Sequence, residues 1–358
     1  MRTAGGPNAA PPDAARLSVV EALEIQADYC AHRDSTVAAR ILTVVADDVA
    51  SGGPTAALLP DTVRFGDFVG LRVMATLHRL ALSRAYPVLG IYFPTLGGTG
   101  PGDPVSRADF GRHVVSALVE HPAEVAYGLS RVPQTNETGR AAPLRSALAR
   151  LGPERPVRLR EIGASAGLNL RADRLPLEAG AWVGPLPAIL DRIGCDLDPV
   201  DITTPEGRLW LSGFVWVDDV ERFQRLATAM RIAAEVPATV VRQDAVDFVG
   251  ALDLVEGTTT VVWHSAMWPY LPDVTRRRIR DGIARLGARA TPAARLAHAS
   301  WERLPDAPDF DGFFGLVLRQ WDGTRDGRPE LLRIGVSHGT ASRAVAPSDE
   351  VLAADPLA

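Results

Sequence analysis

The residues that most clearly indicate a chemical function lie between Glu161 and Asn169, in the stretch Glu-Ile-Gly-Ala-Ser-Ala-Gly-Leu-Asn. An apolar strand pattern precedes this stretch, and a helix is predicted over residues 167–175. Small residues let a backbone approach a ligand closely, and a helix N-terminus offers free N–H groups. The Glu161 carboxylate disfavours a pyrophosphate beside it and suits a ligand with a cationic amino group. The stretch therefore predicts a nucleotide-type binding loop.

The spacing of small residues separates two classes of nucleotide-binding loop. Ser165 and Leu168 stand where the dinucleotide fingerprint GxGxxG needs its second and third glycines. The pattern ExGxSxG instead resembles the first motif of class I S-adenosylmethionine-dependent methyltransferases, with a serine in place of the middle glycine. That resemblance implies a cofactor-binding role for five residues: Glu161, Gly163, Ser165, Gly167 and Asn169.

Two acidic residues further along occupy positions that such a fold uses for the nucleoside. Asp244 and Ala245 end a predicted strand, which the resemblance places near the adenine amino group. Asp244 can equally cap the helix that follows. Asp196 is the candidate for the ribose, although its distance from Gly167 exceeds the ~20 residues typical of a Rossmann unit. A capping or loop role is the alternative for Asp196.

The candidates for catalysis follow the predicted strand over 259–264. His264 is placed where ligands collect in open α/β sheets, and an imidazole pKa of ~6.5 suits a general base. Tyr270 would orient an acceptor molecule, and Trp268 would form part of the substrate wall. The alternatives are a half-buried histidine bonded to backbone and aromatic rings that belong to the core.

A dense polar cluster precedes the binding loop. Its members Gln134, Asn136, Glu137 and Arg140 are candidates for contacting the substrate from a linker folded over the site. If residues 137–151 form a helix, Glu137 and Arg140 share one face at i, i+3. A plain capping arrangement at that helix N-terminus is the alternative.

The elements that must position these residues change in character along the chain. Residues 1–16 are interpreted as a disordered leader, 17–152 as a helical region with no convincing strand before residue 155, 153–345 as the α/β domain and 346–358 as a tail. Predicted strands lie near 157–163, 239–243, 259–264 and 294–300, and predicted helices near 167–175, 218–234 and 271–286. Strand patterns over 312–321 and 330–338 predict a closing antiparallel hairpin. The fold class is therefore α/β: a Rossmann-like, methyltransferase-type, mostly parallel sheet after an all-α region.

Composition excludes several classes of function. The chain has 358 residues, 46% of them apolar, with a net charge of −5, and no apolar run approaches the ~18–20 residues of a membrane span. The 38 basic residues are all arginine, which excludes Schiff-base chemistry and a Walker A loop. Two distant cysteines and seven histidines without HExxH give no metal motif. We expect a cytoplasmic protein with a small-molecule substrate and no nucleic-acid partner.

A resemblance over nearly all of the chain rests on four strings of residues: Pro133 to Arg140 (PQTNETGR), EIGASAGLNL, GCDLDPVDITTPEGRL and VVWHSAMWPYLP. Together they resemble a bacterial family known as a domain of unknown function, of high-GC, actinobacterial type. The family implies a methyltransferase-like fold and leaves activity and substrate open.

Two further interpretations compete with a small-molecule methyltransferase. Gly163 to Gly167 also reads GxSxG, the nucleophile elbow of α/β-hydrolases, with Ser165 as nucleophile; Asp253 or Asp309 and His338 would complete a triad. Against it, an elbow serine follows several earlier strands. The other interpretation is a regulatory module that binds a nucleotide-type ligand without catalysis.

Overall fold

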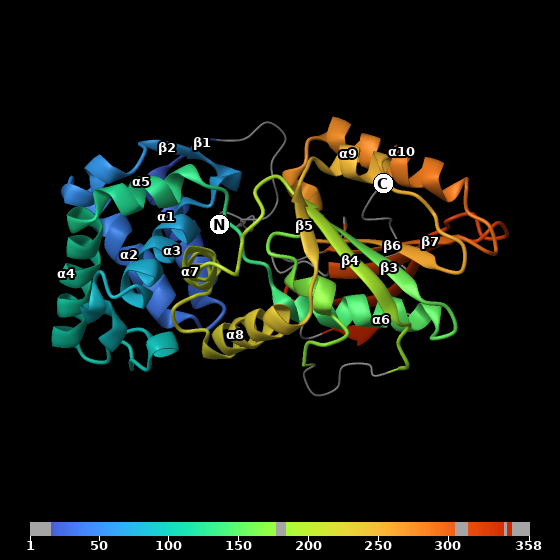
Figure 1. Cartoon of the computed structure of the whole chain (residues 1–358). Coiled ribbons are helices and arrows are strands. Elements are labelled where there is room, and N and C mark those ends of the chain that lie inside the picture. The colour runs from blue at the N-terminus through green and yellow to red at the C-terminus, as the bar shows by residue number, and fades with distance from the viewer. Residues whose placement is uncertain (1–15, 177–183, 305–313, 340–341, 346–358) are drawn as a thin grey trace. The chain divides into compact units, whose positions relative to one another are not determined.

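A computed structural model describes residues 16–176, 184–304, 314–339 and 342–345 (Figure 1). The chain forms two compact units: unit 1 comprises Met1–Thr135 and Asp201–Leu226, and unit 2 comprises Asn136–Val200 and Ala227–Ala358. The predicted boundary lay at residues 152 and 153. In the structure residues 136–152 belong to unit 2, and residues 201–226 belong to unit 1. The predicted leader, apart from Arg16, and the predicted tail lie outside the described residues.

Unit 1 is built mainly from helices, and side-chain caps mark the starts of several of them. In the first of them, Ser18 and Glu21 form a reciprocal capping box, and Asp103 accepts from two backbone amides at the start of another, before Pro104. The helices of this unit are α1 (Val19–Ala31), α2 (Thr36–Ala50), α3 (Val69–Leu82), α4 (Pro104–Glu120), α5 (Pro122–Ser130), α7 (Pro205–Gly213) and the first part of α8 (Val220–Glu235). Four 3-10 turns join them: η1 (Pro54–Leu58), η2 (Phe65–Asp67), η3 (Pro87–Ile91) and η4 (Pro94–Leu96).

The absence of strands before residue 155 was a wrong prediction. β1 (Arg16–Ser18) and β2 (Thr62–Arg64) pair in antiparallel fashion. Each has only three residues, too few for an alternating pattern to be recognised in the sequence. The pair lies beside the start of α1, where the Val19 amide donates to the Asp61 carbonyl at 3.1 Å.

Unit 2 contains a mixed α/β fold with a large, mostly parallel sheet. Among the described residues the sheet has the order β10-β9-β8-β7-β6-β3-β4-β5. The strands are β3 (Val157–Ile162), β4 (Ile189–Asp196), β5 (Thr239–Arg242), β6 (Thr259–Ser265), β7 (Arg295–Arg303), β8 (Phe314–Trp321), β9 (Glu330–Gly335) and β10 (Arg343–Ala344). The five strands from β7 to β5 run parallel, and β8, β9 and β10 are each antiparallel to their predecessor.

Helices cover both faces of this sheet. Figure 1 shows α9 (Ala245–Gly250) and α10 (Asp273–Gly287) on one face and α6 (Ala141–Leu151) on the other. Under α9 and α10, Val262 of β6 packs in one buried cluster with Phe248 and Ile279. Because side chains alternate along a strand, Val262 and His264 share the α10 face, whereas Glu161 and its register neighbour Trp263 point to the other face.

The hairpin at the end of the sheet was predicted, but its position in the strand order was not. In the structure β8 pairs directly with β7, and β9 lies outside it, so the strands are added at the edge in chain order. The sequence pattern showed two adjacent strands, and such a pattern cannot tell which of them pairs with the existing sheet.

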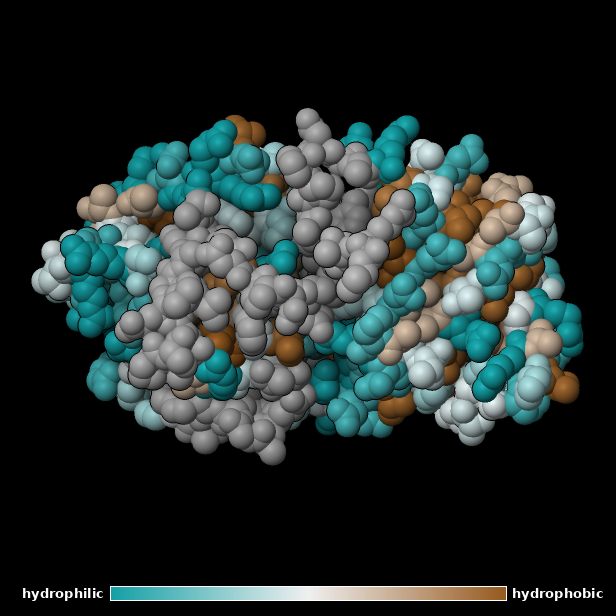
Figure 2. Space-filling view, turned by 180° about the vertical axis from the view of Figure 1, so that it is seen from behind, coloured by the Kyte–Doolittle hydropathy of each residue, from teal (hydrophilic) through white to brown (hydrophobic). Residues whose placement is uncertain are grey.

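The exposed surface is mixed in character. In the described residues no helix is long and apolar enough to cross a bilayer. The most exposed large apolar side chains, such as Val105 at 78% and Val132 at 71%, are far apart along the chain. Figure 2 shows hydrophobic and hydrophilic residues intermixed on the face that it displays.

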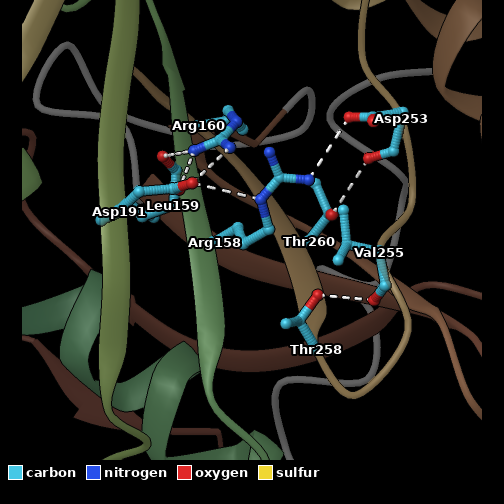
Figure 3. Close-up of polar contacts among 8 residues, drawn as sticks. All are labelled: Arg158, Leu159, Arg160, Asp191, Asp253, Val255, Thr258 and Thr260. Atoms are coloured by element: carbon cyan, nitrogen blue, oxygen red, sulfur yellow. Dashed lines mark hydrogen bonds and ion pairs between the residues drawn. The ribbon is translucent and has the colours of Figure 1, made fainter.

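A charged network lies toward the amino ends of β3 and β4 (Figure 3). The Arg160 guanidinium, 4% exposed, bonds both carboxylate oxygens of Asp191, and the Arg158 Nε donates to Asp191 at 3.2 Å. Partial burial raises the pKa of Asp191, but hydrogen bonds and charge from Arg160 and Arg158 lower it overall. Asp191 therefore neutralises an arginine that the sheet buries.

We expect Asp191→Asn to reduce the free energy of unfolding by about 1–3 kcal/mol, because it leaves the buried Arg160 without a counter-charge. The Asp191 carboxylate is 39% exposed, and solvent around it limits the loss. Asp253→Asn is the matched control, since Asp253 also bonds Arg158 but is 70% exposed. Urea unfolding measures both; equal losses for the two variants would contradict the argument.

Candidate functional site

The loop after β3 has three residues with left-handed backbone: Gly163 (φ 67°), Ser165 (φ 54°) and Gly167 (φ 69°). Gly163 is exposed, whereas residues 164–170 are buried. A side chain at Gly167 would also lack space, since its Cβ would lie 2.7 Å from Val240 Cγ2. Glycine is therefore required at 167 by both backbone and packing, and the loop presents its backbone to the surface at Gly163.

Side chains from elsewhere in unit 2 hold this loop. The Ser165 amide donates to Asp196 Oδ2 at 2.8 Å, from the end of β4. The Leu168 amide donates to Asn136 Oδ1 at 3.1 Å. Two backbone bonds complete the set, from Ala164 N to Cys195 O and from Gly167 N to Ala164 O. The loop amides that could bind an anion are thus largely occupied by the protein, which disfavours a phosphate ligand here.

The helix predicted over 167–175 is wrong. The segment forms a single 3-10 turn, η6 (Leu168–Arg171). The reason is competition for one acceptor: the Gly167 carbonyl accepts from the Leu170 amide at 3.1 Å and from Arg171 Nη1 at 2.7 Å. An α-helix would need that carbonyl for the Arg171 amide. The argument from a helix N-terminus therefore does not hold, because Asn136 already caps the turn.

Glu161 is the most perturbed carboxyl group of the site. It is 2% exposed, and its Oε2 has no hydrogen-bond partner among the described residues. Burial raises its pKa to about 8; charges of Arg171 and Arg140 oppose the rise, as does the Trp263 indole, while Asp196 adds to it. Glu161 thus holds a proton near neutral pH unless a cation comes close enough to ionise it.

The polar cluster before α6 divides between the two units. Gln134 lies in unit 1, whereas Asn136, Glu137 and Arg140 lie in unit 2. Glu137 caps the turn η5 (Thr138–Arg140) through the Gly139 amide, and its carbonyl accepts from Asn169 Nδ2 at 3.1 Å. Arg140 donates to the carbonyls of Ser337 and Ser265 at 3.2 and 3.4 Å. In the structure Asn136 and Glu137 brace the loop, and Arg140 ties their segment to the end of β6 and to Ser337. Contact of these residues with a substrate remains a prediction.

Asn169, predicted to bind cofactor, is 2% exposed. Its Nδ2 is used by Glu137, while its Oδ1 has no partner among the described residues. Asn169 Oδ1 is therefore a second buried acceptor, besides Glu161 Oε2, that is left unsatisfied in β3 and the loop after it. Both groups would gain most from a ligand that donates hydrogen bonds.

The two nucleoside candidates have different structural roles. Asp196 ends β4 and is half-buried; it holds Ser165 and also accepts from the Asp198 amide at 2.9 Å. Asp244 is exposed and caps α9 by accepting from the Val246 amide at 2.7 Å, ahead of the buried Ala245. Both acids follow the carboxyl ends of adjacent strands, so the structure brings them to the same edge as Glu161.

His264 lies on the opposite face of the sheet from Glu161 and is fully buried. Its Nδ1 bonds Glu302 Oε1 at 2.8 Å, and its ring stacks on Trp268 at 5.0 Å. Glu302 also accepts from the Met267 and Trp268 amides at 3.2 and 3.3 Å. If His264 is a base, the segment after β6 must first move away from it. Tyr270, in the turn η7 (Trp268–Tyr270), is exposed, whereas Trp268 is buried.

Sequence reasoning missed a set of buried polar residues on β7. His298, Ser300 and Glu302 are at most 2% exposed, and they recur at every second position of a strand with apolar neighbours. That spacing places all three on the His264 face. Polar residues at a period of two within an apolar strand were a visible signal, because burying them is costly without partners.

The serine hydrolase interpretation loses one of its two candidate acids, Asp253. Asp253 bonds Arg158, the second residue of β3 (Figure 3). Ser165 follows the other end of that strand. At about 3.3 Å per residue, the strand separates them well beyond hydrogen-bond reach. Asp309 lies outside the described residues. Ser165 itself is buried and serves as a loop residue.

The chain belongs to a bacterial family described as "Uncharacterized protein conserved in bacteria (DUF2332)", which it matches over residues 20–343. No curated protein matches it. Among solved structures it is similar to the crystal structure of TrmN from Thermus thermophilus, at 18% identity and a TM-score of 0.25, covering 72% of this chain and 78% of that one. A TM-score of this size is too low to bear on fold or activity.

We expect Gly167→Ala to lower the free energy of unfolding more than Gly163→Ala. Both substitutions force a left-handed backbone, at about 1–2 kcal/mol each, but only the first also pushes against Val240. Gly250→Ala is the control, since an added Cβ there meets nothing. Denaturant unfolding of the three variants orders them; equal losses at 163 and 167 would show that packing at Val240 is unimportant.

The raised pKa of Glu161 gives stability a pH dependence. Between its ordinary value of 4.5 and about 8, the folded state holds a proton that the unfolded state has released. The free energy of unfolding therefore falls as the pH rises through this window. Between about pH 5.5 and pH 8.5 the wild type should lose on the order of 1–4 kcal/mol of its free energy of unfolding through this group. Glu161→Gln should not show this loss, and its stability relative to wild type should therefore rise by that amount over the same window. Glu256→Gln, at an exposed position, should keep the wild-type slope, and a shared slope in all three proteins would contradict the assignment.

Proposed function

We propose that unit 2 has a Rossmann-like, methyltransferase-type fold that binds S-adenosylmethionine at the carboxyl end of β3 and methylates a small molecule. The observation that carries the proposal is the place of β3 in the sheet. From β3 the chain continues outward to β4 and β5, and then returns to β6 on the other side of β3. Such a reversal of strand order is where open α/β sheets bind ligands.

The chemistry of the loop supports this ligand over a dinucleotide. Its amides are occupied, so a pyrophosphate finds few donors, whereas Glu161 and Asn169 offer buried acceptors without partners. A cationic amino group would satisfy these acceptors and ionise Glu161. Gly163 is the exposed point of the loop, where a ligand can approach the backbone.

The residues of the site divide into those that bind the cofactor and those that act on the acceptor. Glu161 and Asn169 bind the amino group, and Asp196 orients the loop and approaches the ribose. Asp244 and Ala245 border the adenine, and the segment Asn136 to Arg140 braces the site. When bound, S-adenosylmethionine supplies an electrophilic methyl group for in-line displacement, which requires mainly proximity and alignment. His264 would remove a proton from the acceptor and Tyr270 would orient it, after the segment that covers His264 has opened.

Calorimetry with S-adenosylmethionine on the purified protein tests the binding step. We expect binding near pH 7 with release of up to one proton, because the ligand's cation ionises Glu161. Glu161→Gln should bind about 10- to 150-fold more weakly and release no proton, since a charge-assisted bond of about 1.5–3 kcal/mol is lost. Measurements in buffers of different ionisation enthalpy count the protons.

Matched variants separate the competing interpretations. Ser165→Gly should bind at least as well as wild type, because glycine suits the left-handed backbone at 165. A serine-directed probe that labels wild type but not this variant would favour a hydrolase. His264→Ala should keep cofactor affinity and lose turnover once an acceptor is known. No binding to wild type would overturn the proposal, and binding without turnover on any acceptor would favour a regulatory module.

A further inference from the structure

Unit 1 buries an arginine between aromatic rings. Arg79 of α3 is 5% exposed, and its guanidinium lies 4.8 Å from the Trp210 ring centroid and 5.8 Å from that of Tyr127. A second guanidinium, of Arg131, lies 4.5 Å from the same Trp210 ring and 5.5 Å from Tyr127. Two cations thus share one pair of rings, contributed by α5 and α7.

Glycines on two neighbouring helices make room for the Arg79 side chain. A Cβ at Gly213 of α7 would lie 2.6 Å from Arg79 Cγ and 2.9 Å from the Ala75 carbonyl. A Cβ at Gly128 of α5 would lie 2.3 Å from Thr76 Oγ1 and 3.2 Å from Arg79 Nη2. The close approach of both helices forms a fitted chamber for this side chain.

The hydrogen bonds inside that chamber are incomplete. Arg79 Nη2 donates to Thr76 Oγ1 at 3.3 Å, but Arg79 Nη1 and Trp210 Nε1 have no partner among the described residues. Trp210 is 3% exposed, so both unpartnered donors belong to side chains more than nine-tenths buried. Leaving a buried charged donor unsatisfied costs more than leaving a neutral donor unsatisfied, and a cation–π contact offers the guanidinium no hydrogen-bond acceptor.

Two guanidinium groups and one exposed carboxylate, that of Glu124, act on this chamber. Burial lowers the pKa of Arg79; Glu124 and Tyr127 raise it, and Arg131 lowers it. Glu124 is exposed, and no carboxylate of the described residues lies within ion-pair distance of Arg79. Arg131 donates to Tyr127 Oη at 2.6 Å, which holds the second cation beside the first. An acceptor with negative charge would complete this arrangement.

We propose that Arg79, Arg131 and Trp210 form a binding site in unit 1 for an oxyanion, a carboxylate or a phosphate. Arg79 Nη1 and Trp210 Nε1 supply donors, and both guanidinium groups supply charge. Tyr127, 46% exposed, and the half-buried Arg131 form the side open to solvent. The site is independent of the cofactor site proposed for unit 2.

Titration of the full chain with inorganic phosphate and with acetate tests the site, by calorimetry and by thermal unfolding, with sodium chloride at matched ionic strength as reference. We expect saturable binding of one anion. Tighter binding of phosphate identifies a phosphate-bearing ligand, and tighter binding of acetate identifies a carboxylate. Arg79→Met should bind at least about tenfold more weakly and melt no lower than wild type in chloride, because it removes a buried, unpaired charge.

Arg112→Met is the matched control, since Arg112 is an exposed arginine of the same unit, and it should bind as wild type does. If Arg79→Met does not fold, Arg131→Met decides, and the proposal requires weaker anion binding in that variant. The proposal is overturned if the anions act on wild type only as chloride does. It is also overturned if the folded Arg79→Met, or Arg131→Met, binds with wild-type affinity, which would make the arginine–aromatic packing purely structural.

Discussion

The conformation of the loop after β3 depends on hydrogen bonds between its backbone groups and side chains of the protein. Asp196 takes the Ser165 amide, Asn136 takes the Leu168 amide, and Arg171 takes the Gly167 carbonyl. These bonds fix three left-handed residues and stop a helix after one 3-10 turn. They also limit which ligand the loop could bind, since occupied amides are not available to a phosphate, whereas the buried acceptors of Glu161 and Asn169 have no partner among the described residues.

Much of unit 2 could be predicted because its strands have distinctive patterns. β3, β5, β6 and β7 lie within a few residues of their predicted positions, and the hairpin of β8 and β9 was visible as two strands around a turn. β4 was not recognised as a strand over Ile189–Asp196, because Asp191 and Arg192 interrupt its apolar pattern. These two polar residues make contacts with residues that are distant in the sequence. Asp191 neutralises Arg160, and Arg192 donates to the Leu170 carbonyl and to Asp173.

The loop after β3 could be located from the sequence, but the contacts of its residues could not. The spacing of Glu161, Gly163, Ser165 and Gly167 identified the loop, and the structure places Asp196 against it. What spacing cannot show is direction: Glu161 and His264 end adjacent strands yet face opposite sides of the sheet. His264 consequently belongs with Glu302 and the polar file of β7, a group whose members contact one another across strands and not along the sequence.

Three buried charged residues of the described part of the chain differ in how the protein compensates their charge. Arg160 is buried with a carboxylate against it, as a structural role requires. Glu161 is buried with arginines nearby but one oxygen unbonded, and its pKa rises to about 8, so it can stay neutral until a cation arrives. Arg79 cannot become neutral in this way, because a guanidinium stays protonated at neutral pH even when burial lowers its pKa. A group that cannot discharge and is not paired by the protein calls for an external partner more strongly than a group that can. By that argument Arg79 needs an external partner more than Glu161 does, although only Glu161 lies where the strand order favours ligand binding.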